Sequence, residues 1–175
     1  MQRRYWLWAG ILSLLMTAPA HAQQGTLVIC GAPDVVGSPS VTEIGGVDVS
    51  ECSDVLGLSS GIEVDIDDSR TRGRPTCDQV EVLKPLDPAS PTYLNLAFQG
   101  TRVQRIDILF FATDADTGLT EQVFELSLRQ SLIVGVSQEV ADDEVIERVT
   151  FAPNRLVATV AESGGVADLR CDGRA

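Results

Sequence analysis

Two groups of carboxylates are the residues whose types and spacing come closest to a chemical site. The segment DADTGLTEQVFE (Asp114–Glu125) begins with the D-x-D pattern of a calcium-binding loop. An EF-hand loop requires an oxygen ligand at its fifth position and glycine at its sixth, whereas here those positions hold Gly118 and Leu119. The segment therefore favours a polar hairpin turn between two strands, with weak cation binding as the alternative.

The second group, DIDDS (Asp65–Ser69), places three carboxylates at the end of a predicted strand. Paired carboxylates can carry acid–base chemistry, but the Gly/Arg-rich segment that follows favours a soluble sheet edge. Weak cation binding is again the alternative. We interpret Arg70, Arg72 and Arg74 in that segment as a solvated loop rather than a binding patch. Ser163 lies in AESGG, which lacks the first glycine of a G-x-S-x-G nucleophile elbow.

The first 22 residues have the layout of a secretory signal peptide. Arg3 and Arg4 form its positive end, Tyr5–Met16 its apolar core and Ala20-His21-Ala22 a small-x-small cleavage site. The apolar core is too short to span a bilayer interior of about 30 Å. A buried N-terminal helix is the alternative. We expect cleavage after Ala22 and export to the periplasm or the medium.

Removal of this segment leaves residues 23–175, a length that fits a single domain. It also removes His21, the only histidine, which excludes Ser-His-Asp and Cys-His catalysis from the mature chain. We find no phosphate loop or cofactor motif, and we expect no enzyme activity, no cofactor and no metal. Two of the 13 Lys and Arg are removed, so the remaining 11 face 25 Asp and Glu, a net charge of −14. This charge argues against nucleic acid or an anionic membrane as partner.

Cysteine usage indicates disulfides, because an even number of cysteines in an exported chain is typical of them. No two cysteines lie within four residues of each other, so no closely spaced pair of metal ligands exists. The spacing leaves all three possible connectivities open. Each disulfide would contribute roughly 2–4 kcal/mol by restricting the unfolded chain. The candidates are Cys30, Cys52, Cys77 and Cys171.

Alternating apolar and polar residues predict eight or nine strands joined mostly by short turns, which indicates an antiparallel sandwich or barrel. Gly135 inside the run LIVGVSQ predicts a bulge, and Pro153-Asn154 suits the middle of a type I turn. In VQRIDILFFAT the apolar residues Ile106, Ile108 and Phe110 share a face. The clearest strand segments are TLVIC, DVLGLSSGIEVDID, CDQVEVL, VQRIDILFFAT, QVFELSL, LIVGVSQ, EVIERVTF and RLVATV.

One short helix, about 90–99, interrupts the strands. Ser90 can cap it, and Pro91 suits the first helical position. Leu94, Ala97 and Phe98 fall on one face, so Leu94 and Phe98 are expected to be buried. Gly100 is a suitable residue just after the helix. Roughly nine residues are too few for a stable helix in water, so packing on the β structure must hold it.

The stretch from residue 82 to residue 138 resembles the Hcp family of tube proteins from bacterial type VI secretion. That family has a strand ending in K-P-x-D-x-x-S-P, then a short helix, a glycine and a long strand ending near FF-x-T-D. Weaker similarity extends the match to about 55–160. The residues that match the motif, interpreted as structural, are Lys84, Pro85, Asp87, Ser90, Pro91, Gly100, Thr113 and Asp114.

The resemblance implies a two-sheet β-barrel with one helix, hexameric rings that stack into a tube, effectors carried in the lumen, and no catalytic residues. Family tube proteins are built in the cytoplasm, so a signal peptide and four cysteines are departures from the family. Three hypotheses follow. The chain is an exported Hcp-like ring-forming protein, structural or a carrier of effectors. Alternatively it is a disulfide-bonded monomeric periplasmic or secreted β-barrel binding module. In the third hypothesis it is a cytoplasmic tube component whose start site is assigned too far upstream.

Overall fold

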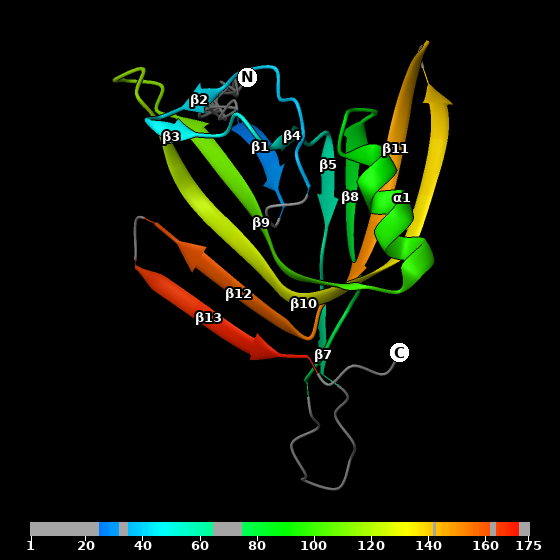
Figure 1. Ribbon diagram of the computed structural model, residues 1–175. Coiled ribbons are helices and arrows are strands. Elements are labelled where there is room, and N and C mark those ends of the chain that lie inside the picture. The colour runs from blue at the N-terminus through cyan, green and yellow to red at the C-terminus, as the bar shows by residue number, and fades with distance from the viewer. Residues whose placement is uncertain (1–24, 32–34, 65–74, 142, 162–163, 172–175) are drawn as a thin grey trace, which may run out of the picture.

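The computed structural model describes residues 25–31, 35–64, 75–141, 143–161 and 164–171. Within these residues the chain is mainly antiparallel β structure with one α-helix (Figure 1), which confirms the expected fold class. No helix in these residues is long and apolar enough to cross a membrane. The predicted signal peptide, the DIDDS carboxylates, the three clustered arginines and Ser163 lie outside the described residues.

The helix is α1 (Ser90–Gln99), and thirteen strands are described. In chain order these strands are β1 (Gly25–Cys30), β2 (Glu43–Ile44), β3 (Val47–Asp48), β4 (Ser53–Asp54), β5 (Gly57–Ser59), β6 (Ile62–Val64), β7 (Pro75–Cys77), β8 (Val80–Pro85), β9 (Arg102–Thr113), β10 (Thr120–Ala141), β11 (Glu144–Ala152), β12 (Arg155–Val160) and β13 (Gly165–Arg170).

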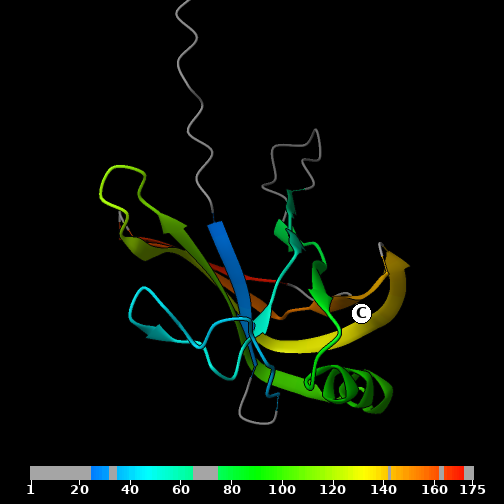
Figure 2. The ribbon, with the colours of Figure 1, turned by 90° about the horizontal axis from the view of Figure 1, so that it is seen from above.

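The main sheet closes into a barrel. Strands pair in the order β1-β9-β10-β11-β8-β5, and β4 pairs with the free side of β1. The short segment that carries β4 and β5 joins the two edges, because Val55 N donates to Leu27 O at 2.9 Å and Leu56 N donates to Leu83 O at 2.7 Å. Figure 2 shows that the sheet is curved and that α1 lies beside the C-terminal half of β10.

Strand β10 organises the whole sheet. The sequence predicts two strands here, but Thr120–Ala141 is a single strand of 22 residues. A register shift between Ile133 and Gly135 confirms the predicted bulge. The first half of β10 pairs with β9 and β12, and the second half pairs with β11. Because β11 and β12 both pair with β10, the Pro153-Asn154 link does not fold one back on the other.

The main apolar cluster fills the inside of the barrel, and a second cluster lies against its side. Strand β9 contributes residues to both clusters. Ile106 and Ile108 are fully buried in the main core, whereas Phe111 is fully buried in the second cluster, under the β2–β3 hairpin. Phe110, predicted on the face of the two isoleucines, is only partly buried. Because β9 is covered on both faces, its sequence is more continuously apolar than that of an ordinary surface strand.

Helix α1 begins and ends where the sequence predicts, but its buried face is different. Tyr93 is fully buried, and Leu96 and Ala97 pack on the core. Leu94 is 45% exposed and Phe98 is 93% exposed, so the prediction that both are buried is wrong. The reason is that Ser90, the first residue of α1, is also buried, so the side of the helix that carries Ser90 faces the core. Residues three and seven positions further on then share that face.

Candidate functional site

The motif that carries the family resemblance forms a buried polar cluster at the start of α1. Lys84 is the only lysine of the chain, and it is fully buried near the end of β8. Its Nζ donates to Pro85 O at 2.8 Å, Asp87 Oδ1 at 2.7 Å, Ser90 Oγ at 3.2 Å and Glu147 Oε2 at 3.4 Å. We call Lys84, Asp87, Ser90 and Glu147 the lysine cluster.

Three elements bring the lysine cluster together. Lys84 on β8 lies directly opposite Glu147 on β11 in the antiparallel register. Asp87 lies in the turn after β8, where its Oδ1 accepts a hydrogen bond from Ala89 N at 3.0 Å. Ser90 begins α1, and its Oγ accepts from Asp87 N at 3.2 Å. The cluster therefore fixes the position of the helix relative to two strands.

The capping prediction for Ser90 is corrected by this geometry. The N-cap residue is Ala89, with no side-chain cap, and Ser90 is the first residue of α1. Its hydroxyl turns back into the lysine cluster, where it accepts from Lys84 Nζ and Asp87 N, because buried charged and polar groups need hydrogen-bond partners. Pro91 does lie in the first helical turn, as predicted.

The lysine cluster is arranged for structure rather than for reaction. An ammonium has three donors, and Lys84 has four acceptors within 3.4 Å, so no free amine is offered to a substrate. The Tyr93 ring centroid lies 5.8 Å from Lys84 Nζ. Burial raises the pKa of the Tyr93 hydroxyl well above its usual value, and the nearby Asp87 and Glu147 carboxylates raise it further.

Sequence reasoning assigned no site role to Glu147 of the lysine cluster or to Tyr93, whose ring lies beside Lys84. Glu147 alternates in phase with the buried Val149 and Phe151 on β11. A single charge in phase with the apolar face of a strand is a readable sign of a buried ion pair. Tyr93 packs edge-on against Phe151, with ring centroids 6.0 Å apart, which places the aromatic ring over the cluster.

The remaining motif residues lie apart from the lysine cluster. Gly100 ends α1 in the left-handed conformation, with φ 61°. At the β9–β10 hairpin, Thr113 and Thr120 share a hydrogen bond of 2.9 Å between their hydroxyl groups. Asp114 Oδ1 accepts from Thr117 N at 2.7 Å and from Asp116 N at 2.9 Å, and these hydrogen bonds lower the pKa of Asp114. The predicted hairpin turn is confirmed.

The structure chooses one disulfide connectivity of the three. Cys30, at the end of β1, pairs with Cys52, just before β4. Cys77, at the end of β7, pairs with Cys171, which follows β13. All four cysteines are bonded, so no free thiol is present. The first disulfide reinforces the closing segment of the barrel, and the second ties the C-terminal hairpin to the strand that precedes β8.

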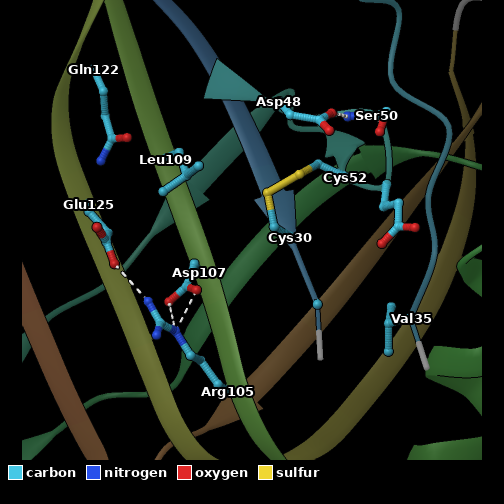
Figure 3. Close-up of a pocket in the computed structure, with 12 residues that line it drawn as sticks. Cys30, Val35, Asp48, Ser50, Cys52, Arg105, Asp107, Leu109, Gln122 and Glu125 are labelled. Atoms are coloured by element: carbon cyan, nitrogen blue, oxygen red, sulfur yellow. Dashed lines mark hydrogen bonds and ion pairs between the residues drawn. A yellow bond between two sulfur atoms is a disulfide. The ribbon is translucent and has the colours of Figure 1, made fainter. Parts of the chain in front are cut away.

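An open depression of about 560 Å³ lies beside the first disulfide (Figure 3). Arg105 Nε contacts Asp107 at 2.6 Å, and Arg105 Nη2 lies 3.3 Å from Glu125 on the neighbouring strand. The hydrogen bond to Asp107 raises the pKa of Arg105. Ser127 also donates to Asp107. This network holds the depression's one arginine between two carboxylates, and within the described residues no three potential metal ligands gather.

Comparison with known proteins identifies the family. The family model described as "Type VI secretion system effector, Hcp" matches residues 46–157, more than half of the 175-residue chain. This range lies close to the stretch of about 55–160 that carries the resemblance in sequence. No curated protein gives a significant match to the chain.

Solved structures agree with this fold. A doubly substituted Hcp1 from E. coli EAEC 042 matches at TM-score 0.70 and 15% identity, over 83% of this chain and 97% of that one. The secreted protein Hcp3 from Pseudomonas aeruginosa matches at TM-score 0.67 and 20% identity, over 87% and 100%. A type VI secretion system effector from Yersinia pestis matches at TM-score 0.60 and 13% identity, over 84% and 99%. Structural likeness at these identities shows the fold, and the family model shows the family. The chain therefore belongs to the Hcp family of type VI secretion proteins, the tube-forming proteins of that system.

Proposed function

We propose that this chain is a ring-forming tube protein whose copies assemble as hexamers, with a structural or carrier role rather than an enzymatic one. The observation that carries the proposal is the family match over residues 46–157. Family membership makes the chain a structural, secreted type VI component. The hexamer, the carriage of effectors and the lack of catalysis are the finer steps that we add.

The surface of α1 supports assembly with further copies. Phe98 is 93% exposed and Leu94 is 45% exposed, on a helix whose other face packs on the core. Leu86, in the turn before the helix, is also 50% exposed. Grouped apolar side chains on a surface mark sites of contact with other proteins. We assign this surface to the neighbouring copy in the ring.

Mass measurement tests the assembly. Light scattering coupled to size-exclusion chromatography is expected to give six times the protomer mass, and negative-stain images should show rings. Phe98→Ser should lower the hexamer fraction without changing the far-UV circular dichroism spectrum, because its side chain lies in solvent in the single copy. Val166→Ser is the matched control on another element, since Val166 is 64% exposed. A strict monomer at all concentrations would contradict the proposal.

Export through a cleaved signal peptide is also part of the proposal. Its support is that all four cysteines form disulfides, which persist in oxidising compartments and are rare in the cytoplasm. The test is N-terminal sequencing of protein recovered from periplasm and medium, which should begin at Gln23. Cytoplasmic protein with free thiols and an intact N-terminus would instead favour a tube component with a misassigned start.

A monomeric binding module is the second candidate function. The observation in its favour is the presence of two open, polar depressions on one barrel, of about 560 and about 1140 Å³. This candidate predicts a monomer by light scattering. It also predicts that Phe98→Ser leaves the mass unchanged.

A further inference from the structure

The larger depression is a basic pocket in an acidic protein. It has a volume of about 1140 Å³ and lies where β9, β10, β12 and β13 meet the second disulfide. Seven of the 13 Lys and Arg lie in the described residues, and four of these seven line this pocket. We call Arg102, Arg129, Arg155 and Arg170 with their surroundings the arginine pocket.

The guanidinium groups of the arginine pocket are not fully matched by the chain itself. Arg155 is paired with Asp168 through two hydrogen bonds. Arg102 Nη1 donates to two neutral acceptors, Gln130 O at 2.9 Å and Asn154 Oδ1 at 3.0 Å. Arg129 Nε is buried without a hydrogen-bond partner among the described residues, which is costly for a donor.

Charge accounting leaves the arginine pocket positive. Arg170 is exposed and forms no ion pair with the described residues. Among the described residues, four guanidinium groups face two carboxylates, Asp78 in the wall and Asp168 beside Arg155, which leaves two positive charges in excess. The whole chain carries a net charge of −12, so this excess makes the pocket a local positive region on a negatively charged protein. A ligand with at least two carboxylates would complement it.

The size and walls of the arginine pocket favour a protein segment as the ligand. Pockets for small molecules measure roughly 300–1,000 Å³, and this one is larger at about 1140 Å³. Its lining also includes apolar groups, among them Val134, which is 47% exposed, and Pro153. The occupant should therefore combine carboxylates with an exposed aliphatic side chain.

The tip of the β10–β11 hairpin has this chemistry. Glu139, Asp143 and Glu144 are all exposed there, and none forms an ion pair with the described residues. Between the two strands of the tip, Val140 is 72% exposed and Val145 is 38% exposed. We call these five residues the acidic tip.

The other acidic hairpin is a poorer candidate. At the β9–β10 turn, the Asp114 carboxylate is already used, because its Oδ1 accepts hydrogen bonds from Asp116 N, Thr117 N and Thr117 Oγ1. Asp116 and Glu121 are the exposed carboxylates that remain at this hairpin, two against the three of the acidic tip. This hairpin therefore offers fewer free carboxylates to the arginine pocket than the acidic tip does.

The acidic tip and the arginine pocket lie at opposite ends of the molecule as seen in Figure 1. The β10–β11 hairpin reaches the top of the view, whereas β7 and the end of β13 lie near the bottom. A contact between two different surfaces of one chain is heterologous, and repetition of such a contact builds rings or filaments.

We propose that the arginine pocket binds the acidic tip of a second copy of this chain, in a head-to-tail contact. This inference rests on the proposed function, since it supplies one of the contacts that assembly requires. Glu139, Asp143 and Glu144 of one copy then meet the unpaired guanidinium groups of the next, and Val140 covers the apolar wall.

A charge-swap series tests the contact by sedimentation velocity over a range of concentrations. Arg170→Glu alone and Glu144→Arg alone are each expected to weaken assembly about tenfold or more, because each places like charges together. The double variant R170E/E144R should recover most of the loss. Matched controls are Arg148→Glu, on a half-exposed arginine outside the pocket, and Asp116→Arg, on the other acidic hairpin.

Carbodiimide coupling gives a second and more direct measurement. Because the only lysine is buried, Arg170→Lys adds an accessible side-chain amine while keeping the charge. In a mixture of ¹⁴N- and ¹⁵N-labelled R170K protein, mass spectrometry should find residue 170 of one isotope joined to Glu139, Asp143 or Glu144 of the other. Joined peptides of one isotope only would mean that the chain's own carboxylates occupy the pocket, and would overturn the proposal.

The outcomes separate this contact from assembly itself. If the wild type assembles and the R170E and E144R variants match it, the head-to-tail contact is wrong while the proposed function stands. If D116R is the variant that restores R170E, the occupant is the other hairpin, which also overturns the contact. A monomeric wild type overturns both. Loss of rings or of longer stacks in each single variant, restored in the double variant, supports the contact.

Discussion

At the scale of single residues, the lysine cluster places more charge in the interior than an ordinary β-barrel does. Lys84 and Glu147 are both fully buried, and Asp87 is nearly so. Removing such groups from water offsets most of their mutual attraction, so a buried ion pair is weak support for stability as such. The hydrogen bonds of the Lys84 ammonium nevertheless fix relative positions, because they join β8, β11 and the first turn of α1. We infer that the cluster sets where the helix lies.

Lys84→Met is therefore expected to be severely destabilising. The variant leaves Glu147 and Asp87 buried without their cation, which typically costs about 3–5 kcal/mol of the free energy of unfolding. Urea titration followed by circular dichroism measures this. Arg148→Met is the matched control, because the Arg148–Glu81 pair is about 40% exposed on both sides and is expected to contribute less than about 1 kcal/mol. Equal losses in the two variants would contradict a special role for the cluster.

Tyr93→Phe gives a prediction of opposite sign. The Tyr93 hydroxyl is buried and has no hydrogen-bond partner among the described residues, so its removal should stabilise the fold by up to about 1 kcal/mol. A destabilisation would mean that the hydroxyl has a partner.

The same variant should change the alkaline limit of stability. Burial raises the pKa of Tyr93, so the unfolded chain loses this proton first. Stability is then unaffected below the unfolded tyrosine pKa of about 10 and falls above it, by up to about 1.4 kcal/mol per pH unit. Urea titrations from about pH 9 to about pH 12 should show a shallower fall in Y93F than in the wild type. Parallel curves would contradict the assignment.

At the scale of elements, α1 is defined at its ends by backbone chemistry and on its faces by packing. Gly100 has φ 61°, and its N–H donates to Ala97 O at 3.2 Å, which ends the helix. The left-handed backbone conformation at this position favours glycine, because residues with a Cβ are sterically disfavoured in it.

Gly100→Ala is expected to destabilise the fold by about 1 kcal/mol. A Cβ at this position would meet nothing within 4 Å, so the loss reports backbone strain alone. Gly135→Ala is the matched control, since Gly135 is not in the left-handed region and its Cβ would be 3.4 Å from Thr150 Oγ1, an ordinary contact. That variant should be neutral or slightly stabilising. Thermal melts of the two variants distinguish these outcomes, and a neutral Gly100→Ala would contradict them.

Helix α1 also shows what could be read from the sequence and what could not. Pro91, Gly100 and the spacing between them gave correct ends, because end signals depend on local backbone geometry. The buried face was wrong, because it depends on which way Ser90 points. That direction is decided by Lys84 and Glu147, the latter 57 positions away in sequence from Ser90. Long-range ion pairs leave only a faint local signal.

For the strands, too, some features could be predicted from the sequence and others could not. Alternation correctly predicted antiparallel β structure, and Gly135 inside an apolar run correctly predicted the bulge. Alternation also split β10 in two, since Gln130 adopts a positive φ of 48° and interrupts the pattern. Pairing partners and disulfide connectivity were not readable, because the residues concerned are far apart in the chain. The arginine pocket shares this property, as its four arginines come from four different strands, β9, β10, β12 and β13.

At the scale of the whole molecule, closure depends on short segments reinforced by covalent bonds. The segment that carries β4 and β5 pairs with β1 on one side and with β8 on the other, and Cys30–Cys52 anchors it to β1. Cys77–Cys171 works over a longer range, because it joins the strand before β8 to the residue after β13. The two disulfides therefore constrain the unfolded chain to different extents.

The double variants C77S/C171S and C30S/C52S should differ in a definite order. The disulfides close loops of sequence separation 94 and 22, and the chain-entropy relation then gives about 4.7 and about 3.4 kcal/mol at 25 °C. Removal of Cys77–Cys171 is thus expected to lower the free energy of unfolding by about 1 kcal/mol more than removal of Cys30–Cys52. Urea unfolding of the oxidised proteins measures the difference, with fully reduced wild type as the common reference. The reverse order would mean that local packing around the buried Cys52, rather than restriction of the unfolded chain, decides what each disulfide contributes.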